Sequence, residues 1–274
     1  VAYCAKKMAL NNYQTYFVKL DDIDNKKEAF KDNGRYYQAV IQQFDKIPEG
    51  IYAYWLNARV IESFSKYDAV WKIAEGKIGL QTGDNNKFLR LWTEIEKDKI
   101  KIYENVNSNV YWIPYNKAGS YRKWYGNHEY VVNWKNDGYA ILNCRDSKGK
   151  LKSRPQNRDY YFKPGLTWSD VCTGKFSMRK MPSNFIFDSC APTLFTNIKI
   201  ENYLLALYNS KVAQLYLDFL TPTIHYTCGS VLKLPCIIAK IDESIVSECV
   251  KIAKMDWDSV ETSWNFQHHP LLYN

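Results

Sequence analysis

The clearest pattern of hydrophobic positions lies in residues 200–220. Apolar residues recur there at steps of four, four, three and four, which is the spacing along one face of an α-helix. The stripe consists of Leu204, Tyr208, Val212, Leu215 and Phe219. We therefore predict one long amphipathic helix that packs this stripe into a core and ends before Pro222.

Weaker helical patterns predict further helices. Residues 24–32 and 53–67 fit a short charged helix and an amphipathic one, and residues 242–254 place Ile245, Cys249 and Ile252 on one face. Asp258 and Glu261 have the spacing of a capping box, which predicts a last helix that stops at Pro270.

Strand patterns predict a β-rich middle. Residues 13–20 and 231–238 read as strands, and residues 110–187 as short strands separated by glycine, asparagine and proline turns. Residues 79–86 contain two glycines and three Asx residues and predict a loop. The expected fold class is α+β: a β-rich domain with long loops, closed by C-terminal helices.

Positive charge is concentrated in residues 117–180. The chain of 274 residues has a net charge of +8, and this window holds 14 Lys/Arg against 5 Asp/Glu. The remaining residues hold 23 bases and 24 acids. Clustered cations interleaved with aromatic rings and amides are typical of a nucleic-acid-binding surface, and a solvated basic face is the alternative.

No motif of a known catalytic class is found. Glycine-rich nucleotide loops and a nucleophile elbow are absent, and the four histidines lack metal-ligand spacing. The seven cysteines form no C-x-x-C pair and are expected to be free thiols of a reducing cytoplasm. No apolar run reaches the roughly 18 residues of a membrane span, and the N-terminal residues lack a signal-peptide core. These patterns favour a binding module over an enzyme.

Several sequence blocks, in order, are more specific than composition. They read GLQTGDNNKFLR at 79–90, KWYGNHEYVVNW at 123–134, SRPQN at 153–157, YYFKPGLTW at 160–168, FIFD at 185–188, LLALYNSK at 204–211 and DWDSVETSW at 256–264. Together they resemble the C-terminal half of the BREX phage-defence adenine-specific DNA methyltransferases. More broadly, they resemble the TaqI-like specificity domain of type IIG and Eco57I-type enzymes.

The resemblance implies a target-recognition portion separated from its catalytic half. The family's Asn-Pro-Pro-Tyr motif and S-adenosylmethionine loop are not in this sequence, so we expect no cofactor in this chain and S-adenosylmethionine in the missing methyltransferase domain. It also implies residues 1–50 as the end of that domain and a linker, 51–240 as the specificity domain and 241–274 as a C-terminal helical segment. The expected partners are double-stranded DNA, the missing domain and, as a further option, other defence proteins, with no membrane, in the bacterial cytoplasm.

Eighteen residues are candidate DNA contacts. The candidates for phosphate binding are Lys117, Arg122, Lys123, Lys148, Lys150, Lys152 and Lys175. Those for base reading are Arg154, Gln156, Asn157 and Arg158. The loop residues Gln81, Thr82, Gly83 and Asn85 offer amides and a close backbone approach. The last candidates, which would lie beside a displaced base or pack against the sheet, are Trp124, Tyr125 and Asn127.

Three other functions fit parts of the pattern. A type IIG specificity domain would carry the same residues beside a nuclease. A protein-interaction module would use the aromatic residues as hot spots. A carbohydrate-binding module is disfavoured by the concentrated positive charge.

Overall fold

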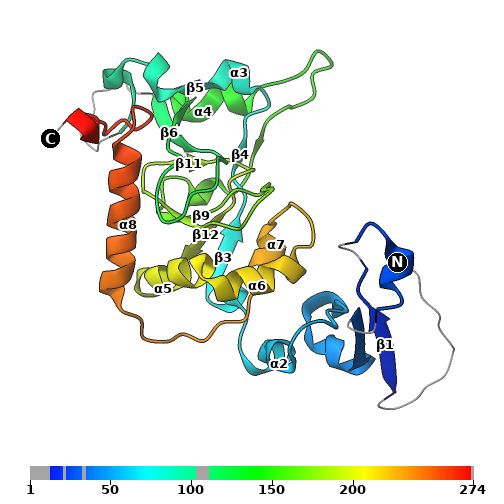
Figure 1. The fold of residues 1–274 in the computed structure, drawn as a ribbon. Helices are drawn as coiled ribbons and strands as arrows, with labels where there is room; N and C mark the ends of the chain where they lie inside the picture. Colours follow the sequence, from blue (N-terminus) through cyan, green and yellow to red (C-terminus); the bar gives the residue numbers. More distant parts are fainter. Residues whose placement is uncertain (1–12, 21–22, 33–34, 103–110, 273–274) are drawn as a thin grey trace. The chain divides into compact units, whose positions relative to one another are not determined.

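The computed structural model describes residues 13–20, 23–32, 35–102 and 111–272. The chain divides into two compact units (Figure 1). The first consists of Val1–Ala69 and Pro235–Ile237, and the second of Val70–Leu234 and Ile238–Asn274.

The described residues of the first unit form a two-stranded antiparallel sheet and two α-helices, with short 3-10 helices at Ile41–Lys46 and Pro48–Gly50. Its elements are β1 (Gln14–Val18), α1 (Lys26–Ala29), β2 (Tyr36–Val40) and α2 (Ala58–Lys66). Aromatic packing holds the sheet, since Phe17 stacks on Tyr54 with ring centroids 4.6 Å apart and meets the buried Phe44 edge-on. The strand predicted at 13–20 and both helices predicted in this unit are confirmed.

In the second unit, the described residues form two four-stranded sheets and a short ladder. The first sheet is antiparallel and has the order β10 (Arg179–Met181), β9 (Gly165–Thr167), β12 (Thr193–Thr196) and β3 (Ala74–Lys77). The second has the order β11 (Ile186–Phe187), β6 (Trp112–Asn116), β7 (Tyr130–Asn133) and β5 (Leu89–Leu91), with β11 parallel to β6. The ladder pairs β4 (Leu80–Gln81) with β8 (Arg154–Pro155).

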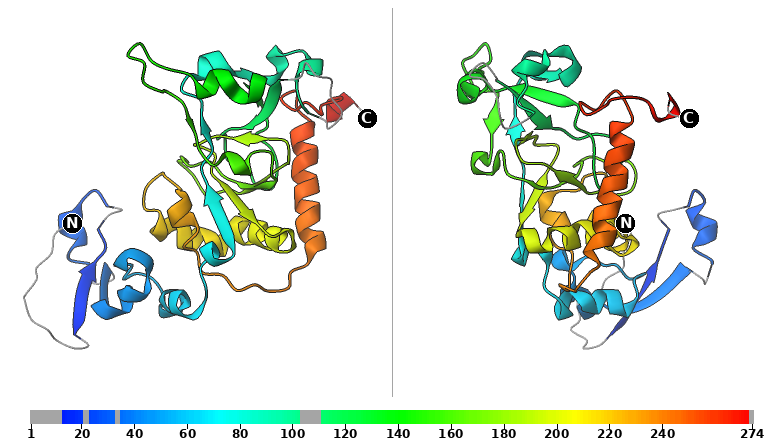
Figure 2. Two further views of the ribbon diagram at one scale, coloured as in Figure 1. Left: turned by 180° about the vertical axis from the view of Figure 1, so that it is seen from behind. Right: turned by 90° about the vertical axis from the view of Figure 1, so that its left-hand side faces the viewer.

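Helices lie at the periphery of this second unit. They are α3 (Asn85–Phe88), α4 (Lys135–Leu142), α5 (Ile198–Asn209), α6 (Lys211–Leu220), α7 (Cys228–Val231) and α8 (Glu243–Asp258). In the left view of Figure 2, α8 (orange) runs along one edge of the unit. Helices and strands are both well represented, so the predicted α+β class is confirmed.

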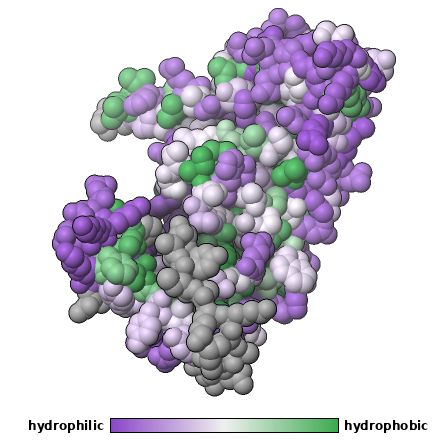
Figure 3. All heavy atoms as spheres, turned by 90° about the vertical axis from the view of Figure 1, so that its right-hand side faces the viewer, coloured by the Kyte–Doolittle hydropathy of each residue, from purple (hydrophilic) through white to green (hydrophobic). Residues whose placement is uncertain are grey.

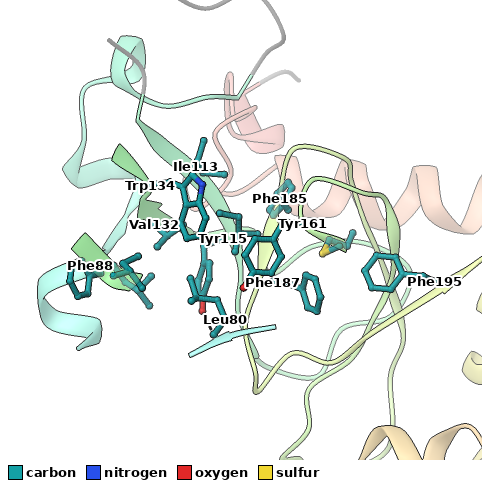
Figure 4. Close-up of a cluster of buried hydrophobic side chains, with 14 residues drawn as sticks. Leu80, Phe88, Ile113, Tyr115, Val132, Trp134, Tyr161, Phe185, Phe187 and Phe195 are labelled. Carbon is teal, nitrogen blue, oxygen red and sulfur yellow. Dashed lines mark hydrogen bonds between the residues drawn. The ribbon is translucent and has the colours of Figure 1, made fainter. Parts of the chain in front are cut away.

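A large aromatic cluster forms the core between the second sheet and β4. It contains Tyr115, Tyr161, Phe185 and Phe187, all at most 5% exposed (Figure 4). Its side chains come from strands distant in sequence, so burial of this apolar surface fixes the middle of the unit.

The helix predicted at 200–220 is two helices. Ser210 has extended backbone angles (φ −79°, ψ 159°), and its side chain accepts a hydrogen bond from the Ala213 amide, which begins α6. Because of this break, the apolar stripe no longer faces one way along its whole length. Leu204 is buried, whereas Val212 and Leu215 are 59% and 45% exposed. The prediction that the whole stripe is core was therefore wrong for these two residues.

Two predictions near the C-terminus were also wrong. Residues 231–238 form no strand, since α7 occupies 228–231 and Pro235 makes only an isolated bridge to Ala69. No α-helix begins at Asp258 within the described residues, because α8 extends to that residue and its carboxylate accepts hydrogen bonds from Lys254 and Ser263.

The described residues contain no helix with both the length and the hydropathy needed to cross a bilayer. All six cysteines among them are free thiols.

Candidate nucleic-acid interface

The β4–β8 ladder brings together two candidate segments that are far apart in sequence. Leu80 lies opposite Pro155, and Gln81 lies opposite Arg154. The predicted loop at 79–86 and the predicted base-reading segment at 153–157 are therefore neighbours in space.

One face of this ladder is anchored in the core. Leu80 is fully buried in the aromatic cluster, and its carbonyl accepts a 2.8 Å hydrogen bond from the Tyr115 hydroxyl (Figure 4). Burial raises the pKa of Tyr115, so this hydroxyl remains a donor. Because side chains alternate along a strand, Gln81 and Arg154 project from the opposite face, and both are exposed.

Two glycines flank β4 and allow close packing. A Cβ at Gly79 would lie 1.9 Å from the Phe187 carbonyl oxygen. Gly83 has φ +79°, and a Cβ there would lie 2.7 Å from the Lys152 carbonyl carbon. The space that we expected to admit a phosphate at Gly83 is occupied by the protein backbone.

Thr82 is 2% exposed, and its hydroxyl donates a 2.6 Å hydrogen bond to Asn85 Oδ1. Asp84 caps α3 by accepting from the Lys87 amide at 3.1 Å. Thr82 therefore shapes the turn from inside, while Asn85 lies exposed at its surface.

A basic hairpin leads into β8. The Lys152 amide donates to the Cys144 carbonyl at 2.8 Å, which pairs the two arms. Asp146 Oδ1 accepts from the amides of Lys148 and Lys150, both at 2.9 Å, which fixes the turn. The exposed bases of the hairpin are Arg145, Lys148, Lys150 and Lys152.

This hairpin projects from the second unit at the upper right of Figure 1. Figure 3 shows the molecule from that side, and hydrophilic side chains cover most of the upper right of the view. The cations of the hairpin are themselves exposed to solvent.

The three candidates after β8 differ in how they are held. Asn157 has φ 51°, and its amide donates to the Ile78 carbonyl at 2.9 Å. The Arg158 guanidinium lies 6.0 Å from the centre of the Trp134 ring. Gln156 is half-buried.

We call the combined surface of ladder, turn and hairpin the hairpin face. It consists of Gln81, Asn85, Arg145, Lys148, Lys150, Lys152, Arg154, Gln156, Asn157 and Arg158. Sequence reasoning missed Arg145. The turn at Ser147–Gly149 was recognisable, and pairing its two arms would have placed Arg145 beside the lysines.

The other basic candidates contact the protein itself. Arg122 makes a 2.8 Å ion pair with Asp256 and lies over the Trp257 ring of α8. Lys123 Nζ donates to the Asn209 carbonyl at 2.6 Å, and partial burial lowers the pKa of this amine. Both side chains tie the loop before β7 to helices.

Two further basic candidates complete this group. The Lys117 amine lies 4.8 Å from the centre of the Tyr130 ring. Lys175 is exposed. In the described part of the chain, neither residue makes a hydrogen bond or ion pair with the hairpin face.

Of the three aromatic and amide candidates of this loop, two make side-chain contacts within the protein, and the third, Trp124, is held through its backbone. The Trp124 amide donates to the Met178 carbonyl at 2.9 Å, and Asn127 is buried with its amide donating to the Ser120 carbonyl at 2.9 Å. The Tyr125 ring meets His128 edge-on at 4.9 Å, and burial raises the pKa of this tyrosine to about 12. Of the two roles that we considered, packing describes the side-chain contacts of Tyr125 and Asn127, and the role of the Trp124 ring stays a prediction.

Within the described residues, no three His, Cys, Asp or Glu side chains are grouped so that they could hold a metal ion. The chemistry that this surface offers is hydrogen bonding and charge.

Comparison with known proteins identifies relatives of the whole chain. No family model matches it. It is 34% identical over 295 residues to the adenine-specific methyltransferase PglX of Lacticaseibacillus casei (strain Zhang), covering 100% of this chain and 24% of that protein. It is 36% identical over 267 residues to the adenine-specific methyltransferase BrxX of Escherichia coli O9:H4 (strain HS), covering 95% of this chain and 21% of that protein.

The chain thus spans less than a quarter of the length of either relative. The similarity extends over nearly all of its residues and confirms the resemblance carried by its motifs. The chain is homologous to one part of the BREX-type adenine-specific methyltransferases.

Proposed function

We propose that this chain recognises double-stranded DNA for an adenine-specific methyltransferase of bacterial phage defence. The observation that carries the proposal is the hairpin face, where cations of the hairpin adjoin exposed amide and guanidinium groups of the β4–β8 ladder. Cations that replace condensed counterions, beside groups that can read base edges, are the two components of a specific DNA interface.

The proposed division of labour follows from how the side chains are held. Lys148, Lys150 and Lys152 lie on an exposed hairpin and would contact phosphates of any sequence. Gln81 and Arg154 lie on a ladder anchored in the core and would contact base edges. Arg122, Lys123 and Asn127 keep their contacts within the protein and support the domain.

In this proposal, methylation is carried out by a part of the full-length methyltransferase that this chain does not span. That part would bind S-adenosylmethionine and methylate an adenine flipped out of the duplex. Residues 51–240 would select the site, residues 1–50 would continue from the catalytic part, and residues 241–274 would close the recognition domain. The protein would act in the bacterial cytoplasm, where its DNA substrate is found.

The test is fluorescence anisotropy of this chain with a labelled random-sequence duplex at several salt concentrations. Each neutralised phosphate contributes about −0.9 to the slope of log K against log salt, so about four contacts give a slope of about −3.6. Absence of binding at low salt, or binding that salt does not weaken, would contradict the proposal. Salt-insensitive capture of another defence protein would instead favour an interaction module.

A further inference from the structure

Gln81 and Arg154 occupy a special position within the hairpin face. They are direct cross-strand partners in the β4–β8 ladder, and their sequence neighbours Leu80 and Pro155 pair on the opposite side. Directly opposite residues in an antiparallel pair have Cβ atoms about 4.5–5.5 Å apart on the same face. The two side chains therefore leave the protein side by side.

The backbone that carries this pair is held from several directions. Leu80 is 0% exposed, and Thr82 and Ser153 are each 2% exposed. Gly79 and Gly83 pack against backbone atoms too closely for any side chain. Side chains that hydrogen-bond to base edges require such a rigid backbone, because a displacement of the side chain by about 0.5 Å weakens a contact made of two hydrogen bonds.

The two side chains themselves are available for a ligand. In the part of the chain that the structure describes, neither the Gln81 nor the Arg154 side chain has a hydrogen-bond or ion-pair partner within the protein, and only their backbones are paired. Both are exposed beside the basic hairpin, which would hold a duplex against them. Arg122 and Lys123, in contrast, are already occupied by Asp256 and Asn209.

We propose that Gln81 and Arg154 read two neighbouring base pairs in the major groove, an adenine by Gln81 and a guanine by Arg154. An arginine can donate two hydrogen bonds to guanine O6 and N7, and a glutamine amide can pair with adenine N6 and N7. Base pairs are stacked about 3.4 Å apart, so two long side chains that start about 5 Å apart can reach consecutive steps. This inference rests on the proposed function and adds which residues set the recognised sequence.

The experiment is selection of bound DNA from a pool of randomised duplexes by the complete chain, followed by sequencing. The variants are R154A, R154K and Q81A, with K150A as a matched control on the hairpin. We expect the wild-type chain to enrich a guanine next to an adenine. In R154A the enrichment of guanine over the other bases should fall about ten-fold, with the adenine position unchanged. In Q81A the enrichment of adenine should fall about ten-fold, with the guanine position unchanged.

Arg154→Lys separates reading from charge. Lysine keeps the positive charge and can still donate to guanine O6 and N7, but it lacks the rigid planar fork, so R154K should weaken the guanine preference less than R154A does while retaining most of the random-duplex affinity. K150A should weaken all sequences alike and leave the consensus unchanged. Thermal unfolding of each variant checks that these exposed substitutions leave the fold intact.

The outcomes distinguish the two proposals. An identical consensus for wild type, R154A and Q81A would overturn the reading pair while leaving DNA binding in place. A guanine preference that survives in R154A would show that another residue reads the guanine, which would also overturn the pair. Failure of the wild-type chain to enrich any duplex, or to bind the pool, would contradict the proposed function and the pair together.

Discussion

Single residues decide where the recognition surface can form. Gly79 and Gly83 let β4 lie directly against Phe187 and Lys152, and Leu80 fills the core between them. The sequence marks 79–86 as an Asx- and glycine-containing loop, but the glycines could equally have approached a ligand. The structure shows that the space beside these glycines is filled by the backbone of Phe187 and Lys152. The sequence could not show this, because these residues are distant from the glycines along the chain.

Gly79→Ala tests this packing. The added methyl group would meet the Phe187 carbonyl, which belongs to the core and cannot move aside, so we expect a loss of about 3 kcal/mol in the free energy of unfolding. Gly174→Ala is the control, because no atom lies within 4 Å of its Cβ position and a change within about 0.5 kcal/mol is expected. Urea denaturation measures both, and equal stability of the two variants would be inconsistent with the packing described.

His128 gives stability a dependence on pH. Its ring is buried against Tyr125 and Phe185, and burial, followed by the charge of Arg179, lowers its pKa from 6.5 to about 3. When the pH falls below the ordinary pKa of histidine, His128 is protonated in the unfolded chain but stays neutral in the folded protein. Its contribution to stability is therefore present above pH 6.5 and is lost as the pH falls from there toward about 3.

His128→Phe removes this titration. Between about pH 7 and about pH 5 we expect the wild-type chain to lose about 2 kcal/mol more unfolding free energy than H128F. Urea denaturation at the two pH values gives the comparison. Parallel losses in the two proteins would mean that this histidine titrates normally when folded.

At the scale of secondary structure, the sequence predicts regular segments well and their interruptions poorly. The 3.6-residue period continues through Ser210, so 200–220 reads as one helix, yet the serine hydroxyl caps a new one. The outward turn of Val212 and Leu215 follows from that break. The predicted strand at 231–238 was wrong because its apolar composition fits any buried segment.

Ser210→Ala tests the cap. Loss of the hydroxyl leaves the Ala213 amide without its partner, so the free energy of unfolding should fall by about 1 kcal/mol. Ser247→Ala is a matched control within α8, where the hydroxyl bonds the Glu243 carbonyl inside the helix and alanine is well tolerated. A smaller effect at Ser210 than at Ser247 in chemical denaturation would argue against the capping role.

The candidate site shows the same limit of sequence reasoning. The basic window was visible from composition, but some of its members lie on the hairpin face, whereas Arg122 and Lys123 lie on a loop that is tied to α5 and α8. That separation depends on contacts such as Arg122 with Asp256, which no local pattern reveals. The pairing of Gln81 with Arg154 likewise depends on the register of two distant strands.

At the scale of the whole molecule, charge is distributed unevenly. The chain carries a net +8, and residues outside 117–180 hold nearly equal numbers of bases and acids. Six of the exposed bases of residues 117–180 lie on the hairpin face, and Lys135, Lys163 and Lys175 are exposed elsewhere in this window. A duplex would therefore meet its strongest attraction where the β4–β8 ladder lies.

The most direct test of this account compares two charge reversals of equal size. K148E/K150E changes the hairpin, and K211E/K240E changes two exposed lysines at the start of α6 and between α7 and α8. By duplex anisotropy, the hairpin variant should lose at least about 50-fold in affinity at ~0.1 M salt and reduce the salt slope by about 1.8, while the control stays close to wild type. Equal losses in the two variants would contradict the assignment of the hairpin face as the DNA-binding surface.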